Sequence, residues 1–230
     1  VDLGIQEEAL FNLAKINLQR GNFQLAVNSL DEYLTSYPQG KRAREVESLL
    51  SDALLNSSDY LRVLDQLDKL KSKSPRIQEA YQKVAFYQAM IYYRDQKWEQ
   101  ALAYLTKSQT FPSDKNLLGE SYFWKGEIYS AQDEFAKAIP AYQNALKQIS
   151  APADYALKST YGLGYAYFNA QDYGSAEVQF EAYRTAQRNK REPAYQDALL
   201  RLGDCYFVQK KFSEAEKVFS LAIESENVGQ

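Results

Sequence analysis

One phrase occurs three times in the chain. It reads YFWKGEIYSAQDEFAKAIPAYQNAL at residues 122–146, YGLGYAYFNAQDYGSAEVQFEAY at 161–183 and LRLGDCYFVQKKFSEAEKVFSLA at 200–222. Each copy contains a glycine, an aromatic residue three positions later, a polar turn, and then the pattern aromatic-x-x-Ala-x-x-x-aromatic. Recurrence at a fixed spacing indicates a protein built from stacked copies of one structural unit.

The alanine in the second half of the phrase sets the period. It recurs every 37 to 39 residues, at Ala101, Ala138, Ala176 and Ala215, and the same frame extends back to Val63 and Ala26. Six units of this length account for nearly all of the 230 residues. We expect one solenoid domain with repeats at about 7–38, 44–75, 82–113, 119–150, 157–188 and 196–227.

Each unit has the periodicity of two helices. In the fourth unit, Tyr122, Gly126 and Tyr129 fall at positions i, i+4 and i+7, which lie on one face of an α-helix. After a polar stretch, Ala138 and Tyr142 repeat this spacing in a second segment. Every unit is therefore predicted to be a pair of antiparallel helices joined by a short turn.

Aromatic and glycine residues mark fixed places in these pairs. We expect an aromatic residue to begin the second helix of every unit, at Phe23, Tyr60, Trp98, Phe135, Tyr173 and Phe212. Glycine inside a helix is less stable than alanine by roughly 0.5–1 kcal/mol, so it needs compensation from packing. We expect Gly126, Gly164 and Gly203 to lie where the first helix of a unit crosses the second.

The spacing resembles the tetratricopeptide repeat, which runs Trp-x2-Leu-Gly-x2-Tyr, then Ala-x3-Phe, and later Ala and Pro. The sixth unit carries this signature in Leu202, Gly203, Tyr206, Ala215 and Phe219. The resemblance implies an all-α, right-handed superhelical solenoid of about six helix–turn–helix repeats. The period exceeds the 34 residues typical of the family and resembles the longer repeats of bacterial cell-envelope proteins, which favours a bacterial periplasm or cell-envelope location over the cytoplasm.

Composition argues against several functions. The chain has no histidine and one cysteine, so histidine-activated nucleophiles and imidazole metal sites are excluded. The formal net charge is −3, with no basic stripe for nucleic-acid phosphates, and no apolar run is long enough to span a bilayer. Cys205 is interpreted as a small core residue. We expect no enzymatic activity, no cofactor, no metal, no nucleic-acid partner and no membrane insertion.

The resemblance also implies a binding surface. In the family, the first helix of each repeat lines the concave side of the superhelix, and residues five, nine and twelve of that helix are among its ligand contacts. In this sequence, these positions give an aromatic-rich candidate groove, formed by Phe86, Met90, Tyr93, Phe123, Glu127, Tyr161, Tyr165, Phe168 and Phe207. Aromatic side chains are frequent anchors at interfaces. We therefore predict a non-enzymatic scaffold or adaptor that binds a protein or peptide segment there.

Two alternatives stay open at this point. The aromatic residues of the first helices could instead pack against neighbouring repeats, and the chain could be a structural self-association module that uses its terminal or convex faces. The last expected helix ends near residue 227, and no further helix follows to cover it. Together with a first residue that is Val1, this predicts a segment of a longer protein.

Overall fold

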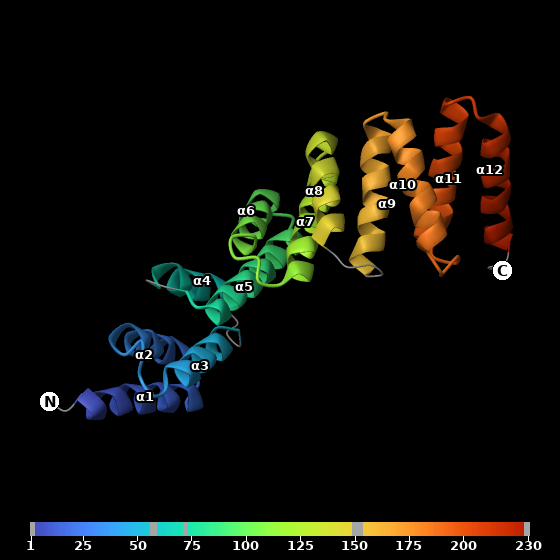
Figure 1. The fold of residues 1–230 in the computed structure, drawn as a ribbon. Helices are drawn as coiled ribbons and strands as arrows, with labels where there is room; N and C mark the ends of the chain where they lie inside the picture. Colours follow the sequence, from blue (N-terminus) through green and yellow to red (C-terminus); the bar gives the residue numbers. More distant parts are fainter. Residues whose placement is uncertain (1–2, 56–58, 71–72, 149–153, 228–230) are drawn as a thin grey trace. The chain divides into compact units, whose positions relative to one another are not determined.

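The computed structural model describes residues 3–55, 59–70, 73–148 and 154–227, and all regular secondary structure among them is helical. In these residues the helices are α1 (Leu3–Gln19), α2 (Phe23–Ser36), α3 (Ala43–Leu55), α4 (Tyr60–Lys69), α5 (Pro75–Arg94), α6 (Trp98–Ser108), α7 (Lys115–Ala131), α8 (Phe135–Gln148), α9 (Asp154–Asn169), α10 (Tyr173–Ala186), α11 (Pro193–Val208) and α12 (Phe212–Asn227) (Figure 1). The predicted all-α repeat fold is confirmed.

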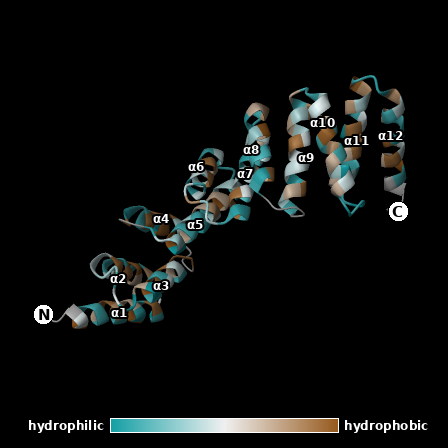
Figure 2. Ribbon diagram, viewed as in Figure 1, coloured by the Kyte–Doolittle hydropathy of each residue, from teal (hydrophilic) through white to brown (hydrophobic). Residues whose placement is uncertain are grey.

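The predicted starts of the second helices are also confirmed. The even-numbered helices begin at the six aromatic residues named above, Phe23, Tyr60, Trp98, Phe135, Tyr173 and Phe212. The repeat bounds stay a prediction, and the end of the expected repeat 119–150 lies outside the described residues. Figure 2 shows hydrophobic and hydrophilic residues alternating along the helices, as expected when one face of each helix packs against its neighbours.

Five of the turns inside the helix pairs share one backbone conformation. A residue with positive φ follows the first helix at Gly21, Gln96, Asp133, Gln171 and Lys210. Around Gln96, its N–H donates to the Tyr93 carbonyl (2.9 Å) and the Lys97 N–H donates to the Tyr92 carbonyl (2.8 Å). These two hydrogen bonds satisfy carbonyl groups in the last turn of the helix. The polar residues of the turns therefore end one helix and start the next.

Packing divides the chain into two compact units, an N-terminal unit, Val1–Leu117, and a C-terminal unit, Leu118–Gln230. The core of the N-terminal unit is mainly aliphatic and includes Leu30, Val46, Leu50, Leu64, Leu67 and Val84. The cores of the C-terminal unit contain more aromatic side chains, among them Phe123, Tyr142, Phe180 and Tyr183.

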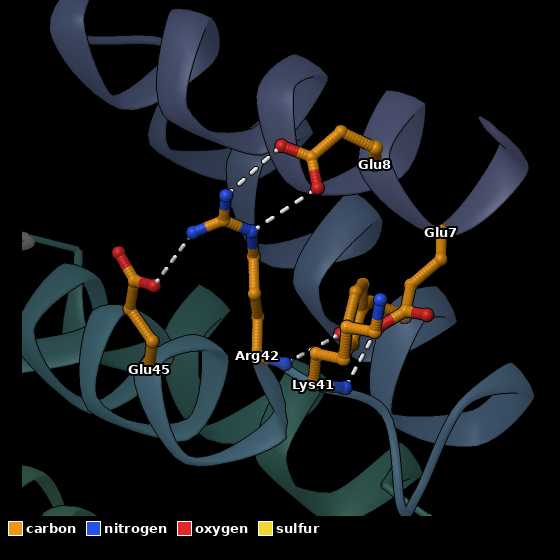
Figure 3. Close-up of polar contacts among 6 residues, drawn as sticks. Glu7, Glu8, Lys41, Arg42 and Glu45 are labelled. Atoms are coloured by element: carbon orange, nitrogen blue, oxygen red, sulfur yellow. Dashed lines mark hydrogen bonds and ion pairs between the residues drawn. The ribbon is translucent and has the colours of Figure 1, made fainter. Parts of the chain in front are cut away.

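A polar network holds α1 against the connection between α2 and α3 in the N-terminal unit (Figure 3). The hydroxyl of Tyr33, on α2, donates to Glu7 of α1, and the backbone N–H of Lys41 donates to the same carboxylate oxygen at 2.9 Å. Arg42 forms ion pairs with Glu8 (3.0 Å) and Glu45 (3.2 Å). The contacts of Glu7 and Glu8 connect residues far apart in sequence, and they therefore fix the first helix onto the start of the next repeat.

The three glycines predicted to lie at helix crossings, Gly126, Gly164 and Gly203, face aromatic rings. A Cβ atom at Gly126 would lie 2.6 Å from the Tyr142 ring, and one at Gly164 would lie 2.9 Å from the Phe180 ring. A Cβ atom at Gly203 would lie 2.4 Å from the Phe219 ring. Only glycine leaves room for these rings, so the buried contact offsets the lower helix propensity.

Candidate binding groove

A groove of about 830 Å³ lies on the C-terminal unit. Helices α7 and α9 supply most of its wall, and α8, α10 and the connection between α10 and α11 complete it. Its larger apolar and aromatic side chains are Phe123, Phe135, Tyr142, Leu157, Tyr161, Tyr165 and Tyr183. The volume lies within the range of about 300–1,000 Å³ that ligand pockets usually have.

Four of the nine predicted binding residues line this groove, namely Phe123, Glu127, Tyr161 and Tyr165. The side chains of Glu127, Tyr161 and Tyr165 are half-buried, so each offers part of its surface to the groove. Phe123 is only 4% exposed and belongs mainly to the core. The structure thus brings these four residues together, and their role in partner binding stays a prediction.

Three of the other predicted residues lie on α5 in the N-terminal unit. Phe86 is 6% exposed and lies in the core, where it offers a partner little surface. Met90 and Tyr93 are half-buried, and the Tyr93 ring packs edge-on against Trp98 with 5.4 Å between ring centroids. These residues do not line the groove of the C-terminal unit.

The last two predicted residues lie on the C-terminal unit but outside the groove lining. Phe168 is half-buried between the ring of Tyr173, 5.5 Å away, and the guanidinium of Arg201, also 5.5 Å away. Phe207 is 60% exposed, and its ring contacts Phe212 at 5.5 Å. Within the C-terminal unit, the groove therefore contains four of the six predicted residues of that unit.

Glu127 is half-buried, whereas the other carboxylates of the groove lining, Asp133, Asp154 and Glu192, are exposed. The Tyr142 hydroxyl donates to its Oε1 at 2.6 Å, and Ser130 Oγ lies 3.3 Å from the Tyr142 oxygen. Since the Tyr142 proton points to Glu127, Ser130 is the donor in the second contact. Burial raises the pKa of Glu127, although the hydrogen bond from Tyr142 and the charge of Lys158 oppose that change.

A second polar network joins α9 to α11. The hydroxyls of Tyr161 and Tyr165 donate to the same oxygen of Asp197, with a distance of 2.8 Å from Tyr161. The Nε of Arg201 lies 3.7 Å from the other carboxylate oxygen. Burial and then the bond to Asp197 raise the pKa of both tyrosines, so both phenols are protonated at neutral pH. Both hydroxyl protons are thus used in hydrogen bonds to Asp197.

Two glycines hold the Tyr142 ring between neighbouring first helices. A Cβ atom at Gly126 of α7 or at Gly162 of α9 would lie 2.6 Å from this ring. The ring is therefore fully enclosed, with 1% of the residue exposed, while its hydroxyl reaches Glu127. The glycine pair lets a residue of the second helix, α8, take part in a surface formed by first helices.

Sequence reasoning missed several residues of this site. Tyr142 and Tyr183 lie on second helices, whereas the resemblance to the family implies contacts from first helices only. Asp197 lies on the first helix α11, but it is not residue five, nine or twelve of its repeat. For Tyr142 a signal exists, because an aromatic residue sixteen positions after Gly126 is placed opposite that glycine. For Asp197 the sequence contains no comparable signal.

Cys205 is fully buried, and burial raises the pKa of its thiol to about 12, which confirms its interpretation as a core residue. Within residues 3–55, 59–70, 73–148 and 154–227, no three or more histidine, cysteine, aspartate or glutamate side chains are grouped to hold a metal ion. None of the described helices is long and apolar enough to cross a bilayer.

Comparison with known proteins gives the family. Tetratricopeptide-repeat models match residues 8–40, 83–112, 119–150 and 161–227, which together make up more than half of the chain. The chain belongs to the tetratricopeptide repeat family. No curated protein sequence matches it significantly.

Several solved structures share the fold of this repeat protein. BtubC (BKLC) from P. vanneervenii is 15% identical, with coverage of 99% of this chain and 92% of that chain and a TM-score of 0.61. YrrB, described as a TPR protein with an unusual peptide-binding site, is 16% identical over 84% of this chain and 91% of its own, with a TM-score of 0.53. A putative kinesin light chain from Podosopora anserina with nearly identical TPR-like repeats is 15% identical over 100% and 99%, with a TM-score of 0.52.

Proposed function

We propose that this tetratricopeptide-repeat chain is a non-enzymatic scaffold that binds a segment of a partner protein in the groove of its C-terminal unit. The observation that carries the proposal is the pair of half-buried tyrosines, Tyr161 and Tyr165, in a groove of about 830 Å³. The fold is shared with YrrB, a protein whose structure is described as having an unusual peptide-binding site. The bacterial cell-envelope location stays a prediction.

The tyrosine pair is suited to binding because it is fixed in advance. Both hydroxyls are bonded to Asp197, and the Tyr161 and Tyr165 rings contact each other with centroids 5.1 Å apart. Side chains that are already ordered lose little conformational entropy when a partner arrives, so more of the contact energy contributes to affinity. Their exposed ring surface provides the apolar contact area.

A blocked groove tests the proposal. Asn169 is exposed and lines the groove, so Asn169→Trp adds bulk there without replacing a core residue. The matched control is Asn28→Trp, at an exposed position of α2 in the N-terminal unit. Immobilised wild-type and variant chains are incubated with a native extract, after circular dichroism confirms folding. We expect a protein retained by the wild type and the control and lost from Asn169→Trp. Equal retention by all three would place the contact elsewhere.

Self-association is the second candidate function, and one observation favours it. In the last repeat, Phe207, Phe212 and Ile223 are 60%, 57% and 62% exposed. Such apolar side chains could pair with a second copy. Light scattering over a range of protein concentrations distinguishes the two functions, because self-association predicts a mass that rises with concentration without any partner and falls in Phe212→Ser.

A further inference from the structure

We propose that the groove of the C-terminal unit selects its partner segment through a basic side chain, lysine or arginine, held at Glu127 beside an apolar residue of the segment. This inference rests on the proposed function and specifies the partner that the same site accepts. It follows from two independent properties of the groove, the direction of its hydrogen bonds and its charge, and from the position of one carboxylate.

The hydrogen bonds of Tyr142, Tyr161 and Tyr165 leave acceptors rather than donors at these side chains. Tyr142 gives its only hydroxyl proton to Glu127, and Tyr161 and Tyr165 give theirs to Asp197. A phenol that has donated its proton still has acceptor lone pairs, and a carboxylate is acceptor-only. A ligand group that hydrogen-bonds to these phenol and carboxylate oxygens must bring a donor. Ammonium and guanidinium groups carry only donors, three and five N–H bonds respectively.

The charge of the lining has the matching sign. Four carboxylates line the groove, those of Glu127, Asp133, Asp154 and Glu192, against the single ammonium group of Lys158. The difference, four negative charges less one positive charge, is −3. Lys158 is already paired with Asp154. The remaining carboxylates favour a cationic ligand, whereas an acidic segment would meet charges of its own sign.

Glu127 is the carboxylate at which a cation gains most. It is half-buried and accepts a hydrogen bond from Tyr142, and among the described residues the one cation whose charge lowers its pKa, Lys158, forms an ion pair with Asp154. Attraction between charges is screened less in a partly buried site than at an exposed one. A purely apolar segment would remove this carboxylate further from water without supplying a positive charge, which is unfavourable. The ligand therefore needs a cation at this point.

The aromatic side chains in the same groove as Glu127 indicate which residue of the partner segment lies beside the cation. Tyr161 and Tyr165 lie on the neighbouring helix α9 and line the same groove together with Leu157. Ring faces attract cations and also accept aliphatic or aromatic side chains. The segment that fits thus places an apolar residue against the tyrosines and a lysine or arginine against Glu127.

A random peptide library displayed on phage is the probe, selected on immobilised wild-type protein. Enriched peptides are synthesised, and their dissociation constants are measured by fluorescence polarisation against wild type, Glu127→Gln, Asn169→Trp and the control Glu216→Gln. Glu127→Gln keeps an oxygen that accepts from Tyr142, removes the charge and replaces the second acceptor oxygen by an NH2 donor. Glu216 is an exposed carboxylate on α12 outside the groove lining, which makes it a matched control.

We expect enriched peptides with lysine or arginine beside an apolar residue. Replacing the basic residue by glutamine should weaken binding to the wild type by about tenfold or more and have little effect on binding to Glu127→Gln. Glu216→Gln should bind like the wild type. Peptides that need an open groove but contain no basic residue, or bind Glu127→Gln equally well, would overturn this inference and leave the proposed function intact. Absence of any peptide that distinguishes wild type from Asn169→Trp would overturn both.

Discussion

The N-terminal and C-terminal units pack equivalent helix crossings with different pairs of residues. In the N-terminal unit, the first helices carry Ala14, Ser51 and Ala89, and the residues sixteen positions later are Leu30, Leu67 and Leu105. In the C-terminal unit, the corresponding pairs are Gly126 with Tyr142, Gly164 with Phe180, and Gly203 with Phe219. A larger side chain on the second helix is thus matched by a smaller residue on the first.

The difference between small residue–leucine pairs and glycine–aromatic pairs has a consequence for the groove. Leucine fills the crossing in the N-terminal unit with an aliphatic side chain, which carries no polar group. Tyrosine at the same position in the C-terminal unit passes between Gly126 and Gly162 and reaches Glu127 with its hydroxyl. The groove with its polar wall therefore lies in the unit in which glycine faces an aromatic ring.

The largest expected effect comes from adding one methyl group to the C-terminal unit. Gly126→Ala would place a Cβ atom 2.6 Å from the Tyr142 ring, which Gly162 confines from α9. Overpacking of a core typically destabilises by about 1–3 kcal/mol, which outweighs the gain of roughly 0.5–1 kcal/mol in helix propensity. Urea unfolding monitored by circular dichroism measures the net loss. A stability equal to or above that of the wild type would show that the ring can move aside.

A pair exchange tests the comparison directly. Gly164→Ala and Phe180→Leu together convert a C-terminal crossing into the alanine–leucine type found at Ala14 and Leu30. Each single change should destabilise, by overpacking or by a cavity, and the double variant should recover part of the loss. We expect a coupling free energy of about 1 kcal/mol in a double-mutant cycle of urea unfolding. Additive effects would mean that the two positions are independent.

Two buried tyrosines allow a smaller comparison between the units. Tyr33 and Tyr142 are fully buried, and each donates to a carboxylate of a first helix, Glu7 and Glu127 respectively. Tyr33→Phe should lower the unfolding free energy by about 1 kcal/mol. Because Glu7 retains a bond from a backbone N–H, whereas Glu127 would lose its hydrogen-bond donor from α8, Tyr142→Phe should lower it more. Equal losses in thermal unfolding would contradict this difference.

The smallest effect is a difference in pH dependence. Burial raises the pKa of Glu127 above its ordinary value of 4.5, so the folded chain binds more protons than the unfolded one and loses stability as the pH rises through this range. Burial alone would raise the pKa of Asp68, but hydrogen bonds from Lys107 and Tyr81 outweigh it and lower the pKa below 3.8. Stability from Asp68 is therefore lost as the pH falls below 3.8.

Unfolding of Glu127→Gln and Asp68→Asn, measured against wild type between pH 3 and 7, checks these signs. The stability of Glu127→Gln relative to wild type should increase with pH, and that of Asp68→Asn should decrease. If the stabilities of the two variants relative to wild type changed with pH in the same direction, the opposite pKa shifts of Glu127 and Asp68 would be ruled out.

The repeated local pattern made much of the fold predictable. Helix starts at residues such as Phe135 and the close helix crossing at Gly126 follow from spacing within a single repeat, which has the same meaning in every copy. The exposure of the candidate binding residues did not follow. Phe123 and Tyr161 occupy equivalent positions of successive repeats, yet Phe123 is 4% exposed and Tyr161 is half-buried in the groove. The volumes of the surrounding side chains decide how deeply each residue lies.

The sequence by itself determined the period, the all-α fold, the starts of the second helices and the close helix crossings at Gly126, Gly164 and Gly203. These properties depend on residues a few positions apart, whose relation is set by the geometry of the helix. Only the tertiary structure decided where the groove lies and which way its hydrogen bonds point. The protons of Tyr142 and Tyr161 go to Glu127 and Asp197, which are 15 and 36 residues distant in sequence, and only the packing of helices brings these groups within bonding distance.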